Sequence, residues 1–153
     1  MTFFSNIQLW LRQYKILPPL SYDQQVWGAK SLMDLYQPAS FFYMSDADQG
    51  GTMLTLWRGS QDGVTYKITV DVDGQSTGPT KCNNPNVIAF GYPPLYSCAQ
   101  AGKMLVKAGI TEAWLHCTLE QLTNGYIMYY FTFHQHAAVT VDAMTGEIIT
   151  ICE

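Results

Sequence analysis

The stretch from Trp114 to Cys152, WLHCTLEQLTNGYIMYYFTFHQHAAVTVDAMTGEIITIC, decides the fold that we expect for this chain. It contains four runs rich in β-branched and aromatic residues, namely WLHCTLEQL, YIMYYFTF, AAVTVDA and EIITIC. The breaks between them are Thr-Asn-Gly, His-Gln-His and Met-Thr-Gly, and such residues favour tight turns. The pattern predicts four consecutive antiparallel strands.

The same order of elements is predicted twice along the chain. A helix over 97–108, which ends at Gly109, precedes the four C-terminal strands. In the first half, a helix over 24–36 is followed by strands at 40–46, 52–58, 64–72 and, more weakly, 75–80. The sequence ITVD at 68–71 matches VTVD at 139–142. We therefore expect an α+β fold made of two repeated helix-plus-antiparallel-meander units.

An amphipathic helix is predicted ahead of both units. Apolar residues recur at steps of three or four from Phe3 to Leu17, and the pair Pro18-Pro19 ends the pattern. We expect the apolar face to pack on the sheet, because only Arg12 and Lys15 could meet the anionic head groups of a membrane. The expected organisation is an N-terminal helix over 1–20, a first unit over 21–80, a linker over 81–96 and a second unit over 97–153.

Composition narrows the classes of function. Hydrophobic residues make up 48% of the chain, which argues against disorder. The net charge is −4 and no cluster of Lys and Arg occurs, so we expect no binding to nucleic acid. No apolar run approaches the ~20 residues of a membrane span, and the N-terminus lacks the features of a signal peptide. We expect no membrane contact and favour a cytoplasmic location, with export as the alternative if the sequence begins at a mature end.

The ending VTVDAMTGEIITI resembles the last hairpin of PepSY domains, whose closing pattern is a strand, V-D-x-x-T-G-E-I and a second strand. The residues that carry the resemblance are Val141, Asp142, Thr145, Gly146, Glu147 and Ile148. The first half is similar more weakly, with Val70-Asp71 and Asp73-Gly74 but no T-G-E-I. The resemblance implies a cystatin-like α+β fold and a binding or inhibitory role, since PepSY domains occur in protease propeptides and as peptidase inhibitors. PepSY domains are typically exported or membrane-linked.

The histidines are candidate metal ligands. His134 and His136 stand two positions apart, as ligands on one side of a strand do, and His116 and Cys117 could add further ligands. The alignment of the two halves instead places 134–136 in a turn, and no carboxylate lies close in sequence to orient the rings. We therefore expect no metal and no cofactor.

The four cysteines allow three disulfide pairings. Cys82 and Cys98 flank one irregular segment and could staple it, whereas Cys117 and Cys152 fall in predicted strands and suit the core as thiols. We favour reduced thiols. Cys98 is also the best candidate nucleophile, because it opens a helix, and a histidine could serve as its base. Cysteines at helix starts are commonly structural, so we expect no catalytic residue and no enzyme.

Aromatic and apolar residues in loops mark the surface that we expect to meet a protein partner. The candidate partner-binding residues are Trp57, Arg58, Phe90, Tyr92, Leu95 and Tyr96. The last four lie in an irregular apolar segment that either buries itself between the two units or contacts the partner.

These observations favour a non-enzymatic protein-binding module that inhibits or antagonises an enzyme such as a peptidase. An immunity protein or a phage-encoded antagonist would have the same properties. The alternative is a small-molecule or metal-binding protein that uses the sheet face with His116, His134 and His136. The expected state is a monomer or a homodimer.

Overall fold

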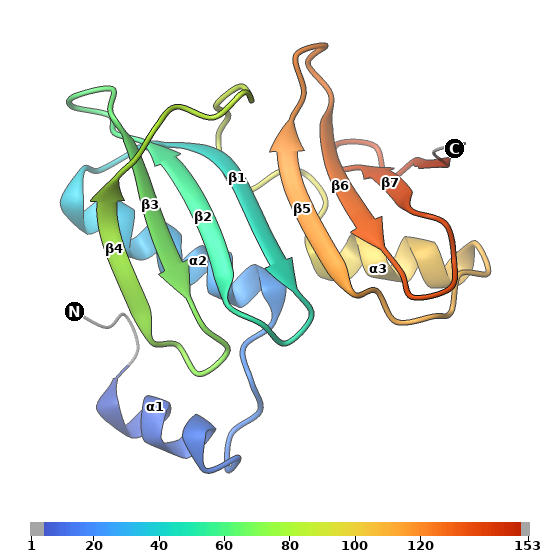
Figure 1. The fold of residues 1–153 in the computed structure, drawn as a ribbon, viewed down its shortest axis with the longest axis horizontal. Coiled ribbons are helices and arrows are strands. Elements are labelled where there is room, and N and C mark those ends of the chain that lie inside the picture. The colour runs from blue at the N-terminus through green and yellow to red at the C-terminus, as the bar shows by residue number, and fades with distance from the viewer. Residues whose placement is uncertain (1–4, 151–153) are drawn as a thin grey trace.

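One continuous antiparallel sheet runs through the computed structural model, which describes residues 5–150 (Figure 1). Within these residues the sheet has eight strands in the order β4-β3-β2-β1-β5-β6-β7-β8. The helices are α1 (Asn6–Gln13), α2 (Tyr22–Tyr36) and α3 (Cys98–Lys107). The strands are β1 (Phe41–Asp48), β2 (Met53–Arg58), β3 (Thr65–Val70), β4 (Ser76–Lys81), β5 (His116–Gln121), β6 (Ile127–Thr132), β7 (Val139–Asp142) and β8 (Ile148–Thr150). The predicted α+β class and the order of the elements are confirmed.

Each of the three helices begins with the same local device. Ser5, Ser21 and Ser97 are the N-caps, and each side chain accepts the backbone N–H of a glutamine three positions later. The glutamine side chain in turn accepts the backbone N–H of the serine, which completes a capping box. The repeated motif Ser-x-x-Gln therefore fixes where the helices start.

The sheet buries one face and leaves the other uncovered by any of the described helices. Helices α2 and α3 lie on the same side of the sheet, behind the strands in Figure 1. The side chains that alternate toward these helices form the core, including Phe42, Trp57, Ile68, Leu119 and Phe131, each at most 1% exposed. Strand alternation thus produces a covered face and an open face.

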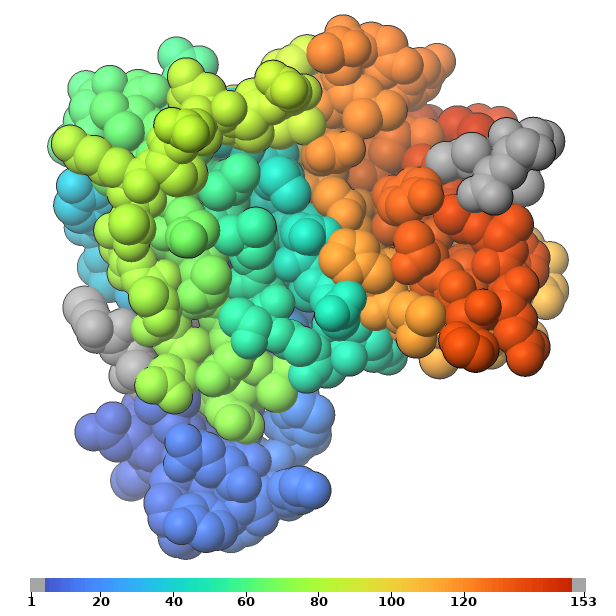
Figure 2. Space-filling model, in the orientation of Figure 1, coloured from blue at the N-terminus to red at the C-terminus, as the bar shows by residue number. Residues whose placement is uncertain are grey.

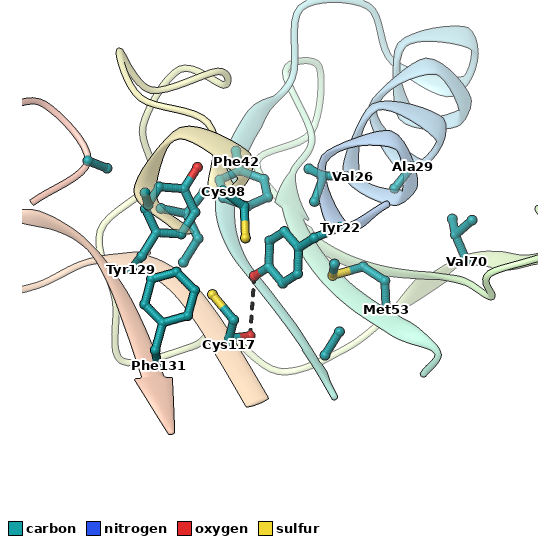
Figure 3. Close-up of a cluster of buried hydrophobic side chains, with 14 of the residues drawn as sticks. Tyr22, Val26, Ala29, Phe42, Met53, Val70, Cys98, Cys117, Tyr129 and Phe131 are labelled. Carbon is teal, nitrogen blue, oxygen red and sulfur yellow. Dashed lines mark hydrogen bonds between the residues drawn. The ribbon is translucent and has the colours of Figure 1, made fainter. Parts of the chain in front are cut away.

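The two halves of the sheet meet where β1 pairs with β5. The ladder pairs Met44–Asp48 with His116–Glu120 in antiparallel register. The buried hydroxyl of Tyr22, at the start of α2, lies 2.9 Å from the carbonyl oxygen of Ser45 on β1 and 3.3 Å from that of Cys117 on β5 (Figure 3). Burial raises the pKa of Tyr22 well above its ordinary value, so the hydroxyl stays a donor. This residue ties both strands of the junction to α2.

A second contact joins the two helices of the covered face. The carboxylate of Asp23 on α2 accepts the backbone N–H groups of Cys98 and Ala99, at 2.8 and 3.0 Å. Those groups have no partner within α3, since a helix leaves its first N–H groups unpaired. The negative charge also complements the positive end of the α3 dipole.

The segment between β4 and α3 closes one end of the junction. Phe90 exchanges two backbone hydrogen bonds with Phe42, each 2.8 Å long, and the N–H of Ile88 donates to the carbonyl of Gln121. The Phe90 ring packs against Phe42 with ring centroids 5.2 Å apart. The predicted linker is therefore partly built into the sheet, beyond the point where the β1–β5 ladder ends.

The expected packing of the N-terminal helix on the sheet is wrong. Helix α1 has no buried residue, and it stands apart below the sheet in Figure 1. It is also shorter than predicted, and the expected contribution of Phe3 lies outside the described residues. Among the helices described, none has the length and apolar character needed to traverse a bilayer.

Substitution of Tyr22 by Phe tests the junction. The change removes the hydroxyl and leaves buried acceptors with one donor fewer, so the free energy of unfolding should fall by about 1–3 kcal/mol. Urea denaturation followed by circular dichroism measures it. The matched control is Tyr126→Phe, which removes a hydroxyl from a side chain that is 53% exposed and should change stability by less than about 0.5 kcal/mol. Equal effects of the two substitutions would contradict the role assigned to Tyr22.

Candidate functional site

The open face of the sheet carries the candidate site. Figure 2 views the molecule from this side, with the strands of both halves at the surface. The ladder register assigns the side chains that share this face across the four central strands. They include Met44, Asp46, Asp48, Leu54, Leu56, His116, Thr118, Glu120 and Tyr130, and we call these nine side chains the open-face cluster.

The centre of the cluster is a histidine held between two carboxylates. His116 lies directly across from Asp48, and its Nδ1 is 2.7 Å from the Asp48 Oδ1 atom. The Nε2 atom of the same ring contacts Asp46 Oδ1. The hydroxyl of Thr118 donates to Asp46 Oδ1 at 2.7 Å. Since β1 supplies the carboxylates and β5 supplies the imidazole, the site exists only when the two halves pair.

The carboxylates change the protonation of the groups beside them. Partial burial alone would lower the pKa of His116, but the hydrogen bond to Asp48 and the charge of Asp46 outweigh it, and the pKa is raised. The pKa of Glu120 is raised by burial and by the charge of Asp46. The centre of the face is therefore acidic, with a histidine that favours its charged form.

Apolar side chains flank this acidic centre on both sides. Leu54 and Leu56 on β2 lie across from Asp46 and Met44 and are half-buried. On the other side, Tyr130 on β6 lies across from Thr118 and is 37% exposed. The face therefore combines apolar and charged groups, with the charges at its centre, whereas a typical protein interface has an apolar centre and a polar rim.

Two of the predicted partner-binding residues are buried, which corrects their assignment. Trp57 is 1% exposed, and its indole N–H donates to the Thr55 hydroxyl at 2.7 Å. Phe90 is 8% exposed and belongs to the core. Trp57 points to the covered face because strand residues alternate, and its neighbour Arg58 points to the open face. Neither aromatic ring can contact a partner in this conformation.

The other four predicted residues are dispersed. Arg58 is exposed and lies over the Phe41 ring, with its guanidinium carbon 5.9 Å from the ring centroid. Leu95 is 68% exposed, in the linker and away from the sheet register. The structure thus does not gather the predicted residues into one surface.

Tyr92 and Tyr96 are half-buried in contacts within the chain. The Tyr92 ring packs edge-on against Trp27, with centroids 5.4 Å apart. The carbonyl of Tyr96 accepts the hydroxyl of Tyr129 at 2.9 Å. A Cβ added at Gly146 would lie 2.7 Å from the Tyr96 ring, so the turn before β8 packs closely on the linker. Both tyrosines therefore pack the linker against other parts of the chain.

The histidines predicted as alternative ligands do not converge. His134 and His136 lie in the bend between β6 and β7, as the alignment of the halves predicted, and both are exposed. Glu112 accepts the backbone N–H of Gln135 and of His136 at 2.9 Å, which fixes the bend. Within residues 5–150 no group of three or more His, Cys, Asp or Glu side chains is arranged to hold a metal ion.

The three cysteines of the described region are free thiols, as we favoured from the sequence, and the alternative disulfide between Cys82 and Cys98 is not formed. Cys98 and Cys117 are both buried and their side chains are in contact (Figure 3). Burial raises the pKa of the Cys117 thiol well above its ordinary value. Cys117 faces the core, opposite to its neighbour His116, so no Cys–His pair forms between them. Cys152 lies outside the described residues.

A groove of about 660 Å³ lies on the covered side, between the start of α2, the β1–β2 turn and α3. Its lining is mainly apolar and includes Tyr22, Val106 and Trp114, with Asp23, Asp48 and Lys103 as charged members. Asp23 is already engaged as the cap of α3. The groove can hold a small apolar molecule, and it reaches the open-face cluster at Asp48, which lines both.

Sequence reasoning missed the Asp46–His116–Asp48 arrangement. The two aspartates are about 70 positions from the histidine, so no local motif connects them. The spacing of Asp46 and Asp48 at i, i+2 does place both on one face of a predicted strand. Only the pairing of β1 with β5 brings His116 between them.

Comparison with known proteins finds a solved structure with a similar fold. No protein-family model matches this chain, and no curated protein matches it. Among solved structures, a "putative lipoprotein" from Clostridium difficile 630 matches with a TM-score of 0.62, over 84% of this chain and 92% of that chain, at 10% sequence identity. An identity this low establishes a shared α+β fold alone. The resemblance to PepSY domains stays a prediction.

The His116 arrangement predicts a pH-dependent stability. The folded-state pKa is raised, so the stabilisation is complete below the unfolded pKa of about 6.5 and is lost as the pH rises through the folded value. The loss should be below about 1 kcal/mol, because the side chain is partly exposed and its charge is screened. Chemical denaturation at a series of pH values measures it. The variant His116→Asn should lose this pH dependence, whereas exposed His134→Asn should keep it; a His116→Asn profile equal to that of the unmodified protein would contradict the assignment.

Proposed function

We propose that this chain is a non-enzymatic protein-binding module that uses the open face of its sheet. The observation that carries the proposal is the open-face cluster, in which half-exposed apolar side chains surround an acidic centre on a surface that none of the described helices covers. An antiparallel sheet commonly leaves one face in water, and exposed apolar groups together with polar ones on such a face mark a candidate site for protein contact. The predicted role as an inhibitor or antagonist of an enzyme such as a peptidase fits a surface that occludes its target.

The chemistry of the face defines the partner that it would bind. Asp46 and Asp48 contact His116, and Glu120 adds a third carboxyl group near Asp46 on the same face. A partner that presents a lysine or arginine between apolar side chains would pair with the carboxylates and cover Leu54, Leu56 and Tyr130. Charge pairing of this kind sets orientation and association rate, and the apolar contacts supply most of the affinity.

We also propose that the two halves are tandem PepSY-like, cystatin-like units. Each half has a helix that begins with a Ser-x-x-Gln capping box and is followed by four consecutive strands. The turn after the third strand is built alike in both halves. Asp71 Oδ1 accepts the N–H groups of Asp73 and Gln75, and Asp142 Oδ1 accepts those of Met144 and Thr145. The shared order of elements and the two Asp turns support descent from one duplicated unit, whereas the capping box also begins α1, which lies outside both units.

A second candidate function is the binding of a small apolar ligand. The groove of about 660 Å³ between α2 and α3 favours it, since clefts of this volume accommodate drug-sized molecules. This candidate uses the covered side of the sheet, and Asp48 is the residue that its groove shares with the open-face cluster.

Affinity capture with matched variants tests the proposed function. The unmodified chain should retain one dominant enzyme from a cell extract, and that enzyme should lose activity at about one equivalent of the chain. Leu56→Glu, on the open face, should weaken retention roughly tenfold or more, because it buries a charge against the partner. Leu35→Glu is the control, since Leu35 lies on α2 and is 69% exposed.

Retention should also weaken as salt is raised, because the carboxylates contribute to association. Capture that survives Leu56→Glu as well as Leu35→Glu would contradict binding through the open face. If the captured enzyme keeps its activity, the proposal that the chain binds a protein still holds. The proposal that it inhibits that enzyme is then contradicted.

A further inference from the structure

Two buried thiols from separate elements meet in the core. Cys98 is the first residue of α3, and Cys117 lies on β5. The two side chains are in contact, and Figure 3 shows both sulfur atoms near the hydroxyl of Tyr22. Cys82 instead follows β4, the strand at the outer edge of the first half of the sheet. The fold therefore brings Cys98 and Cys117 together, although no local sequence motif connects them.

The contact has the arrangement that a disulfide requires. A disulfide joins two sulfur atoms at about 2 Å, and both side chains must point toward each other if the bond is to form without backbone movement. The sulfur atoms of Cys98 and Cys117 point into the same space in Figure 3. A single buried thiol usually serves as a small apolar side chain. Two thiols in contact have a further reaction open to them, because they can be oxidised together.

The groove between α2 and α3 reaches one of the two thiols. Cys98 belongs to the lining of this groove and is 4% exposed, whereas Cys117 is completely buried. A small reagent in the groove would therefore meet Cys98 first. Burial also raises the pKa of the Cys117 thiol well above its ordinary value, so Cys117 stays protonated and is a poor first nucleophile. Position and protonation together assign the first step of an oxidation to Cys98 and the second to Cys117.

We propose that Cys98 and Cys117 form a site of reversible oxidation, at which a small disulfide in the groove converts the two thiols into a buried disulfide between α3 and β5. In the first step the Cys98 sulfur loses its proton and attacks one sulfur of the reagent. The S–S bond of the reagent breaks, and one half stays on Cys98 as a mixed disulfide. The other half takes up the proton and leaves as a thiol.

In the second step the Cys117 sulfur attacks the Cys98 sulfur. The bond between Cys98 and the reagent breaks, and the second half of the reagent leaves as a thiol with the proton from Cys117. Over both steps the two residues lose two electrons and two protons, which reduce the reagent to two thiols. Because the second step is intramolecular, the contact between the side chains offsets the small fraction of Cys117 that is ionised.

The bond would fasten α3 to a strand at the junction of the two halves. Cys117 pairs with Ala47 of β1, and its carbonyl oxygen lies 3.3 Å from the Tyr22 hydroxyl. The neighbouring His116 belongs to the open-face cluster, on the other side of the sheet. Oxidation would therefore stabilise the junction from the covered side, and this inference does not depend on what the open face binds.

A variant that keeps only these two cysteines tests the proposal. Cys82→Ser and Cys152→Ser are combined, because trypsin otherwise leaves two cysteines on each of the relevant peptides, which are 82–103 and 108–153. The folded variant is incubated with hydroxyethyl disulfide, which is small and uncharged, and is then digested without reductant. Mass spectrometry should find the two peptides joined, and dithiothreitol should separate them.

Three results would overturn the proposal. The first is a mixed disulfide that remains on Cys98 with no bond to Cys117. The second is a bond between two copies of the chain, which gel filtration without reductant detects as a dimer. The third is that both thiols stay free after prolonged incubation of the folded variant with an excess of the reagent.

Thermal unfolding of the same variant provides a second measurement. The cross-linked form should melt roughly 5 °C or more above the reduced form, because the bond restricts the unfolded chain. Adding Cys117→Ala should abolish both the joined peptides and the response of the melting temperature to the reagent. A cross-linked form that does not melt above the reduced form would contradict the claim that the folded core already places the two thiols for the bond.

Discussion

The pairing of β1 with β5 is the constraint on which the rest of this structure depends. Five residue pairs join the two halves of the sheet, and the Tyr22 hydroxyl contacts backbone oxygens on both strands. Each half alone would expose the edge of a strand at the junction, and the unpaired N–H and C=O groups of such an edge can pair with other chains and cause aggregation. Their union removes both edges at the centre, and the linker closes the end of the junction through Phe90.

The same pairing creates the two surfaces of the molecule. On the covered side it brings α2 next to α3, so that Asp23 can cap the second helix. On the open side it places His116 of one half between Asp46 and Asp48 of the other. The acidic centre of the open-face cluster is therefore a consequence of the junction, and a disruption of the junction would remove the site as well as the stability.

The helices and strands could be predicted from the sequence, whereas the residues exposed on each face of the sheet could not, because exposure depends on contacts between distant segments. Strands and turns are encoded by residues that are close in sequence. The turn at Asn124-Gly125 and the bend at 134–136 could therefore be placed from the local sequence. The contacts of Trp57 depend on which face of its strand is covered, and that is decided by distant helices. The pairing of His116 with Asp46 and Asp48 depends on a register that no local pattern encodes. Whether α1 packs on the sheet likewise depends on contacts with distant elements, and no residue of α1 is buried.

Native-state hydrogen exchange of the backbone amides tests most directly the claim that the two halves form one sheet. The account predicts that amides of β1 and β5 in the junction exchange only through global unfolding, with the free energy that denaturation gives for the whole protein. Amides in β2 and β6 should show the same value, as expected for one cooperative unit. The contrary result would be that junction amides exchange rapidly while β2–β3 and β6–β7 stay protected with two different free energies. The halves would then be independent units, and the open-face cluster would not persist in solution.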